Sequence, residues 1–303
     1  MLKKHTYFFI FLVLITWIAG CSEKKEETLI IKFKNKQQSF EIIEAYKLYP
    51  DYFKAADGQP ANKKEELYQS KIIQPVYNSC FKDAEYPYMD DNLINNPPEQ
   101  TAKKTLSSTD SKELISSIKE ALMKSSEYLP GKKKTSVCIF PPQENNQDNA
   151  VTVGAGKIIY SARPSNSPDR IKTVIAHEYH HSVWTELYAY PSTSLLDNLV
   201  FEGKAVMFEK MVFPNLKGMY VNTAYQTAYW DQIKNDLDNP DLNKSFEVLF
   251  GGNGLPLLYG YSEGYKMVEN YIKKYKVDNI KTWTKMSARE IFEKGEYEKN
   301  YSH

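Results

Sequence analysis

A cluster of histidines in the middle of the chain constrains the fold most strongly. The sequence of 303 residues has only five His, and three of them lie in the run His177-Glu178-Tyr179-His180-His181. The order His-Glu-x-x-His places two imidazoles one helical turn apart, with a carboxylate beside the first. At about 100° per residue, His177, Glu178 and His181 project from the same side of a helix. The run is therefore predicted to form a helix with a functional face.

The residues before this cluster carry the signals that begin a helix. Ser167 is a favourable N-cap, Pro168 suits the first helical position, and Asp169 places a negative charge in the first turn. The apolar segment 174–176 leads directly into the cluster, as a buried helix requires. We expect the helix to run from here to about Tyr188.

Two imidazoles at this spacing can bind one zinc ion, at nitrogen–metal distances of about 2.0–2.1 Å. A catalytic site needs a third protein ligand and one open position. No further His is suitable, since His5 lies in the leader and His303 is the last residue. Glu202, 21 residues after His181, is the favoured third ligand. Gly203 beside it would allow close approach of its helix to a neighbour.

Other residues near the cluster are weaker candidates for the metal site. Glu209, seven residues beyond the favoured carboxylate on the same expected helix, is the second choice. Asp197 and Glu186 are expected to be capping or solvated acids. His180 is expected to support the ligands or to line the cleft, rather than to bind the metal.

The remaining sequence predicts a small sheet before the histidine helix and further helices after it. Apolar and alternating runs predict a hairpin over 28–43 and a buried strand over 137–140. The segment 150–160 suits either a hairpin or one strand with a glycine bulge. A helix is expected over 68–80, with a kink or break at Pro75, followed by a loop at 83–108. A capping box at Asp110 predicts the start of the next helix. After the histidine helix, further helices are expected over 194–213, 224–237, 242–250, 261–274 and 288–294. These patterns predict one α+β domain over 29–303, mostly helical.

The first residues resemble a bacterial lipoprotein signal. Lys3 and Lys4 precede an apolar run of 13 residues, too short to cross a hydrocarbon core of about 30 Å. The run ends in Ala19-Gly20-Cys21, where Cys21 is expected to carry the lipid. We expect removal of residues 1–20, a tether over 21–28, and a lipid anchor in a bacterial membrane outside the cytoplasm, with the protein at the cell surface or facing the periplasm. An uncleaved N-terminal anchor is the alternative.

Charge and cysteine content limit the kinds of partner and of covalent bond that the chain can have. The 39 Lys and Arg balance 38 Asp and Glu, and only three of the basic residues are Arg, which argues against a nucleic-acid partner. Cys80 and Cys138 remain in the expected mature chain. Export would permit a disulfide, but the sequence carries no distance information, and two buried thiols are the favoured interpretation.

Four segments together resemble a known family. They are VTVGAGKIIY (151–160), HEYHH (177–181), FEGKA (201–205) and GYSEGYKMVENYI (260–272). In this order, over roughly residues 41–297, they resemble the YjaZ-like family of predicted bacterial zinc-dependent proteases. The resemblance implies a zincin-like fold of the gluzincin type with one zinc ion per chain. It implies His177 and His181 as ligands, Glu202 as third ligand and Glu178 as base.

One position departs from the pattern of better-known gluzincins. In those proteins an Asp four residues after the third ligand supports a ligand His, whereas this chain has Val206 there. A different residue is therefore expected to orient the imidazole.

These features predict a membrane-anchored zinc metallopeptidase that acts on peptides or proteins. Glu178 would serve as general base for a zinc-activated water, and Tyr261 or Tyr265 would stabilise the oxyanion, although this i, i+4 pair is also typical of helix packing. The segment 151–160 suits an edge strand that pairs with an extended peptide, or a purely structural strand. The alternatives are a non-catalytic lipoprotein that binds zinc or a partner, and a hydrolase of another amide or ester.

Overall fold

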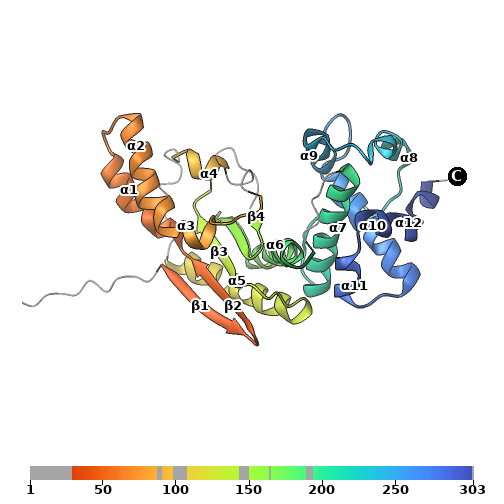
Figure 1. Cartoon of the computed structure of the whole chain (residues 1–303), viewed down its shortest axis with the longest axis horizontal. Helices are drawn as coiled ribbons and strands as arrows, with labels where there is room; N and C mark the ends of the chain where they lie inside the picture. Colours follow the sequence, from red (N-terminus) through yellow and green to blue (C-terminus); the bar gives the residue numbers. More distant parts are fainter. Residues whose placement is uncertain are drawn as a thin grey trace, which may run out of the picture.

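The computed structural model describes residues 29–86, 91–97, 108–142, 150–163, 165–188 and 194–301. Over these residues the fold is α+β, as predicted, with a mixed five-stranded sheet in the N-terminal part and helices around and after it (Figure 1). The predicted signal segment, Cys21 and the tether lie outside the described residues. Within the described ranges, no helix has the length and apolar character needed to cross a membrane.

The sheet contains every strand that the sequence predicts. The strands are β1 (Ile30–Asn35), β2 (Gln38–Ile43), β3 (Thr135–Phe140), β4 (Ala150–Gly154) and β5 (Lys157–Ser161). Their spatial order is β1-β2-β3-β5-β4, and β3 runs parallel to both of its neighbours. The outer pairs β1–β2 and β4–β5 are antiparallel hairpins. The second hairpin turns at Ala155-Gly156, where Gly156 has a φ of 77° that glycine tolerates best.

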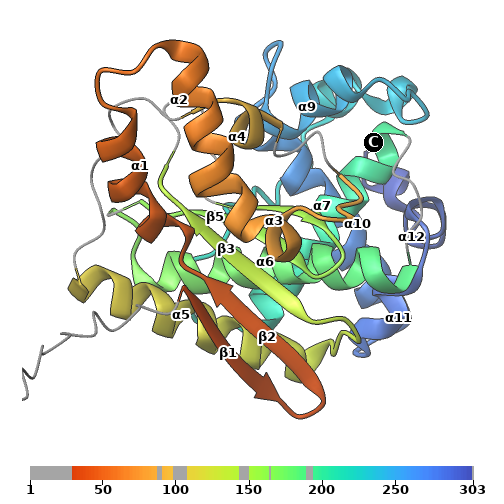
Figure 2. The ribbon, with the colours of Figure 1, turned by 60° about the vertical axis from the view of Figure 1, so that its left-hand side comes forward.

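Helices cover both faces of the sheet. The helices α1 (Tyr49–Ala56), α2 (Ala61–Tyr68) and α3 (Gln74–Cys80) lie on one face, and α5 (Ser108–Tyr128) and α6 (Pro168–Tyr188) lie on the other. Figure 2 shows α3 and α6 on opposite sides of β3. Val137 and Ile139 of β3 belong to the core on the α5–α6 side, whereas Cys138 and Phe140 belong to the core on the α3 side. Burial on both faces explains why the segment 137–140 of this strand is apolar throughout.

A disulfide joins the two layers on the α3 side. Cys80, the last residue of α3, is bonded to Cys138 of β3, with 6.0 Å between their Cα atoms. The favoured interpretation of two buried thiols is therefore wrong. The pairing depends on how α3 packs on β3, which no local sequence pattern reports.

Some helix boundaries in the N-terminal half differ from the predictions. The chain stays helical through Pro75, because a π-helical turn at Gln69–Ile73 joins α2 to α3 and widens the backbone just before the proline ring. The predicted loop at 83–108 contains the short helix α4 (Asp91–Asn95). Because α5 begins at Ser108, Asp110 lies inside the helix and is not its N-cap.

The C-terminal half is a group of helices that packs against α6 (Figure 1). They are α7 (Leu195–Val212), α8 (Thr227–Trp230), α9 (Leu242–Phe250), α10 (Tyr259–Tyr275), α11 (Ile280–Lys285) and α12 (Ala288–Lys294). The helices predicted over 242–250 and 288–294 are confirmed. The one predicted over 224–237 is wrong, because this segment forms only α8 and a short 3₁₀ turn. The helix α11 has six residues, too few to show a helical period in the sequence.

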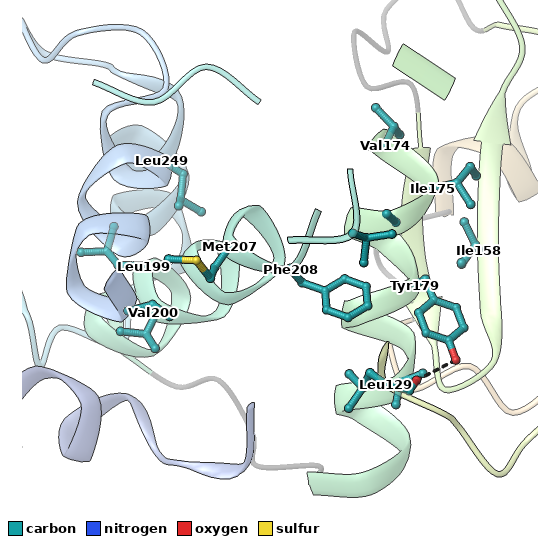
Figure 3. Close-up of a cluster of buried hydrophobic side chains, with 14 of the residues drawn as sticks. Leu129, Ile158, Val174, Ile175, Tyr179, Leu199, Val200, Met207, Phe208 and Leu249 are labelled. Carbon is teal, nitrogen blue, oxygen red and sulfur yellow. Dashed lines mark hydrogen bonds between the residues drawn. The ribbon is translucent and has the colours of Figure 1, made fainter. Parts of the chain in front are cut away.

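Close packing of α6, α7 and α10 positions the functional part of the chain. Figure 3 shows Phe208 of α7 facing Tyr179 of α6, whose hydroxyl donates to the main-chain oxygen of Leu129 at 2.8 Å. On the other side of α7, a Cβ atom added at Gly203 would lie 2.0 Å from the carbonyl carbon of Gly264 in α10. The expected close approach at Gly203 is therefore confirmed, and α10 is the helix that it admits.

Candidate metal centre

The helix α6 carries the histidine cluster through the middle of the protein. It begins at Pro168, as predicted, and the Oγ of Ser167 accepts a hydrogen bond from Arg170 N at 3.3 Å. Its central residues, from Thr173 to Thr185, are all buried, since α6 lies between β4, α5 and α7 (Figure 1). The imidazoles therefore sit in protein surroundings rather than in bulk water.

Three side chains from α6 and α7 converge at one point. The Nε2 atoms of His177 and His181 lie 3.0 Å apart, and Glu202 Oε2 lies 3.1 Å from the first and 3.3 Å from the second. Both imidazoles are about 95% buried, and the Glu202 side chain is 16% exposed. Ligands of a tetrahedral zinc ion at about 2.0–2.2 Å lie about 3.3–3.5 Å from one another. The donor set and its spacing therefore fit a zinc ion with three protein ligands.

The charges of this group support the same conclusion. Burial disfavours the imidazolium of His177, but its hydrogen bonds with Glu202 and Glu209 outweigh this and raise its pKa to about 10. Burial alone would raise the pKa of Glu202, but the neighbouring imidazoles lower it to about 2. A buried carboxylate held in its charged form next to two imidazoles is an environment that favours a cation.

A second carboxylate supports the far side of one imidazole. Glu209 Oε2 lies 3.5 Å from Nδ1 of His177, so Glu209 contacts the ring nitrogen that faces away from the convergence point. Its side chain is about 99% buried, and its other oxygen accepts a hydrogen bond from Met219 N. Better-known gluzincins have an Asp at the position of Val206 that contacts a ligand His, and in this chain Glu209 makes the corresponding contact with His177. Its position fits a support for the imidazole, and it lies outside the group of three donors that converge on one point.

The remaining acidic residue of the cluster is held by the sheet. Thr152 Oγ1 lies 2.8 Å from both the main-chain oxygen and Oε2 of Glu178. Thr152 belongs to β4, the edge strand beside α6, and the sequence analysis did not single it out. The signal was present, because a buried hydroxyl in an otherwise apolar strand requires a polar partner.

Two cavities meet at these side chains. Residues that line both are Ala150, His177, Glu178, Phe250 and Tyr261. The first cavity, of about 140 Å³, has a mainly apolar wall that includes Phe201, Phe246 and Leu249. The second, of about 260 Å³, includes Arg170, Val174, Met219 and Leu258. A ligand that occupies both cavities must pass directly over the His177–Glu178 part of α6.

The two tyrosines predicted as oxyanion donors have different positions. Tyr261 lines both cavities, and its ring centroid lies 6.3 Å from that of His177. Tyr265 lines neither cavity; its hydroxyl donates to Glu269 at 3.2 Å, and its ring faces Lys210. The structure therefore brings Tyr261, and not Tyr265, to the candidate centre.

The third histidine of the cluster points away from the centre. His180 is fully buried, its ring stacks on Trp283 at 5.7 Å, and its Nε2 lies 3.3 Å from Oγ1 of Thr284. Burial lowers the pKa of His180 well below its ordinary value, so this ring stays neutral. It lines neither cavity, so the alternative in which His180 lines the cleft is wrong.

The other candidate acids have structural roles. Asp197 forms the capping box of α7 with Ser194. Glu186 accepts hydrogen bonds from the main-chain nitrogens of Lys132 and Lys133 at 2.7 and 2.9 Å. Neither lies in the metal group, as the sequence analysis expected.

Comparison with known proteins finds one family. A family model described as "Predicted Zn-dependent protease (DUF2268)" matches residues 114–293. This range extends from α5 to α12 and covers more than half of the chain, including His177, Glu178, His181 and Glu202. No curated protein and no solved structure matches the chain.

Proposed function

The chain belongs to the DUF2268 family of predicted Zn-dependent proteases, and from this premise we propose that it is a zinc metallopeptidase. The observation that carries the proposal is the convergence of His177, His181 and Glu202 within 3.3 Å of one another, with Glu178 in the adjoining cavity wall. The three convergent residues would hold one zinc ion. When bound, zinc supplies Lewis acidity for a peptide carbonyl and lowers the pKa of water.

Glu178 is the proton carrier in this proposal. It follows the first ligand on α6 and lines both cavities, so it can accept a proton from water and return it to the leaving amine. The bond from Thr152 Oγ1 restricts the rotation of its carboxylate and leaves the second oxygen available. A zinc carrier has no need of such a base, which favours the peptidase over the zinc-binding lipoprotein.

The surrounding elements suit an extended peptide. Ala150, Val151 and Thr152 of the edge strand β4 line the first cavity, so main-chain groups of a peptide can pair with this strand. Tyr261, which lines both cavities, would donate a hydrogen bond from its phenol to the developing oxyanion. Recognition through the peptide main chain would distinguish peptides from other amides and esters.

The location of the protein is part of the proposal. A lipid on Cys21 would attach the mature chain to a bacterial membrane outside the cytoplasm, at the cell surface or facing the periplasm, with 22–28 as a tether. The Cys80–Cys138 disulfide supports this location, because such bonds persist in oxidising compartments.

The substitution Glu178→Gln tests the proposal against the zinc-binding alternative. The purified protein should contain about one zinc per chain by elemental analysis, and the variant should retain it. Cleavage of an internally quenched peptide library should fall by about 10²- to 10⁴-fold in the variant. Equal cleavage by the two proteins would refute the role of Glu178 as the base. Loss of zinc from His181→Ala and Glu202→Ala, without any peptide cleavage in the parent, would favour the non-catalytic lipoprotein.

A further inference from the structure

The second cavity contains a charged group that the proposed chemistry does not use. Arg170 lies on α6 and lines this cavity together with the apolar side chains of Val174, Met219 and Leu258. Among the described residues it provides the only Lys or Arg side chain that lines either cavity. The two cavities therefore differ in charge as well as in size.

The carboxylates that line this cavity already have partners within the protein. Glu209 contacts His177 and accepts a hydrogen bond from Met219 N, and Glu178 is held by Thr152. The guanidinium of Arg170 forms no ion pair or hydrogen bond with any side chain in the described ranges of the chain; only its main-chain atoms are bonded, to the hydroxyls of Ser167 and Thr173. A half-buried guanidinium with five donors in this position is suited to an anionic ligand.

The distance from Arg170 to the metal centre sets which part of a ligand it can reach. Arg170 and His177 are seven residues apart, so they share a face of α6 and are separated by about 10.5 Å along its axis. An extended peptide covers that distance with about three residues. Arg170 therefore lies within reach of a group up to about three residues from the bond that is cleaved.

Part of the wall of this cavity is formed by a constrained loop. Leu258, which lines the cavity, has a φ of 57°, and Gly251, Asn253 and Gly254 earlier in the same loop also have positive φ values. A left-handed conformation is costly for leucine and persists only where the surrounding structure enforces it. The loop therefore holds an apolar side chain in the wall of the cavity that Arg170 also lines.

We propose that Arg170 binds a carboxylate of the peptide substrate, which makes the enzyme selective for peptides with an acidic group near the cleaved bond. The inference rests on the proposed peptidase function. Two carboxylates have the required chemistry, an Asp or Glu side chain and the C-terminal carboxylate of a short peptide. Either can form a bidentate pair with the guanidinium.

A set of matched quenched peptides tests the proposal. Each peptide carries Glu, Gln or Lys at one position within three residues of the cleaved bond, with either a free or an amidated C-terminus. The parent should prefer a carboxylate by about 10- to 100-fold in kcat/KM, the range expected for hydrogen bonds to a charged group. Arg170→Gln should lose this preference and still cleave the neutral peptides, and Arg170→Glu should prefer Lys.

The C-terminal amides separate the two sources of the carboxylate. A preference that disappears on amidation assigns Arg170 to the chain terminus, and one that persists assigns it to an acidic side chain. The control Arg289→Gln removes an arginine that pairs with Asp238 and lines neither cavity, so it should keep the parent preference.

Binding measurements keep the two proposals distinguishable. Fluorescence anisotropy of the same peptides on the Glu178→Gln protein, with and without Arg170→Gln, reports recognition without turnover. No cleavage by the parent would refute the peptidase function, and selective binding would still support the role of Arg170. Equal effects of Arg170→Gln on acidic and neutral peptides, in cleavage or in binding, would overturn that role.

Discussion

Nδ1 of His177 lies 3.5 Å from Oε2 of Glu209, a buried carboxylate seven residues beyond Glu202 on α7. One helix thus supplies both a candidate ligand at Nε2 and the support at Nδ1 of the same imidazole. Gly218 makes room for this arrangement, because a Cβ atom at that position would lie 2.4 Å from Glu209 Oε1. The carboxylate that contacts Nδ1 therefore comes from α7, the helix of the candidate third ligand Glu202. Better-known gluzincins have this acid at the position that Val206 occupies here.

Replacement of Glu209 should weaken zinc binding without removing a ligand. Glu209→Gln keeps the volume of the side chain but loses the charge that orients His177, and loss of such a partner typically costs 10- to 100-fold in metal affinity. Competition with a fluorescent zinc chelator measures the change. Glu66→Gln, at an exposed position of α2, is the matched control and should leave the affinity unchanged. An unaltered affinity in Glu209→Gln would show that the carboxylate does not support the imidazole.

Replacement of Thr152 should affect the rate more than substrate binding. Thr152→Val removes the hydroxyl that holds Glu178 Oε2, so the base should sample unproductive rotamers. We expect kcat to fall by about tenfold, as for the loss of one hydrogen bond to a charged group, with little change in KM or zinc content. Thr152→Ser should restore the rate, because it restores the hydroxyl. A rise in KM with normal kcat would instead assign Thr152 to peptide binding.

Zinc binding should release a proton and should strengthen as the pH rises. In the metal-free protein the pKa of His177 is about 10, so this imidazole is protonated at neutral pH, whereas zinc requires its neutral form. The apparent affinity should rise about tenfold per pH unit above pH 6.5, and by less as the pH approaches 10. Calorimetry in two buffers with different ionisation enthalpies counts the protons. An affinity that is constant between pH 7 and 9 would contradict the assigned charge state.

The same pKa predicts how the stability of the metal-free protein depends on pH. A folded-state pKa above the ordinary value of about 6.5 stabilises the fold below that pH, and this contribution is lost as the pH rises through about 10. The metal-free protein should therefore lose stability over this window. Thermal unfolding with and without zinc should show a difference that widens with pH.

The disulfide should contribute strongly to the stability of the N-terminal layer. The bridge links residues 58 positions apart, for which the loop-closure model gives about 4 kcal/mol. The double substitution Cys80→Ala with Cys138→Ala should lower the free energy of unfolding by about this amount in urea titrations. Thiol titration of the unfolded parent checks the bond directly, since two reactive thiols would show that the cysteines are unpaired.

The sequence determines the local features of this protein. The spacing of His177 and His181 places both imidazoles on one side of α6, because helix geometry depends only on neighbouring residues. For the same reason, the start of α6 at Pro168 and the helix α9 were predictable from caps and apolar spacing. The sequence did not predict α11, because six residues are too few to show a helical period. The break predicted at Pro75 is absent, because a π-helical turn just before it lets the helix continue.

Only the tertiary structure decides which distant residues meet at the candidate centre. The contacts of Glu202, Glu209 and Thr152 with the α6 cluster join residues that are more than 20 positions apart in the sequence. These distances depend on how α6 packs between β4 and α7, and a packed interior has a specific geometry that no local pattern encodes. The same reason explains why Tyr261 reaches the centre and Tyr265 does not. The two tyrosines are one helical turn apart on α10. The contact of α10 with Gly203 fixes the position of this helix, so that only Tyr261 lines the cavity.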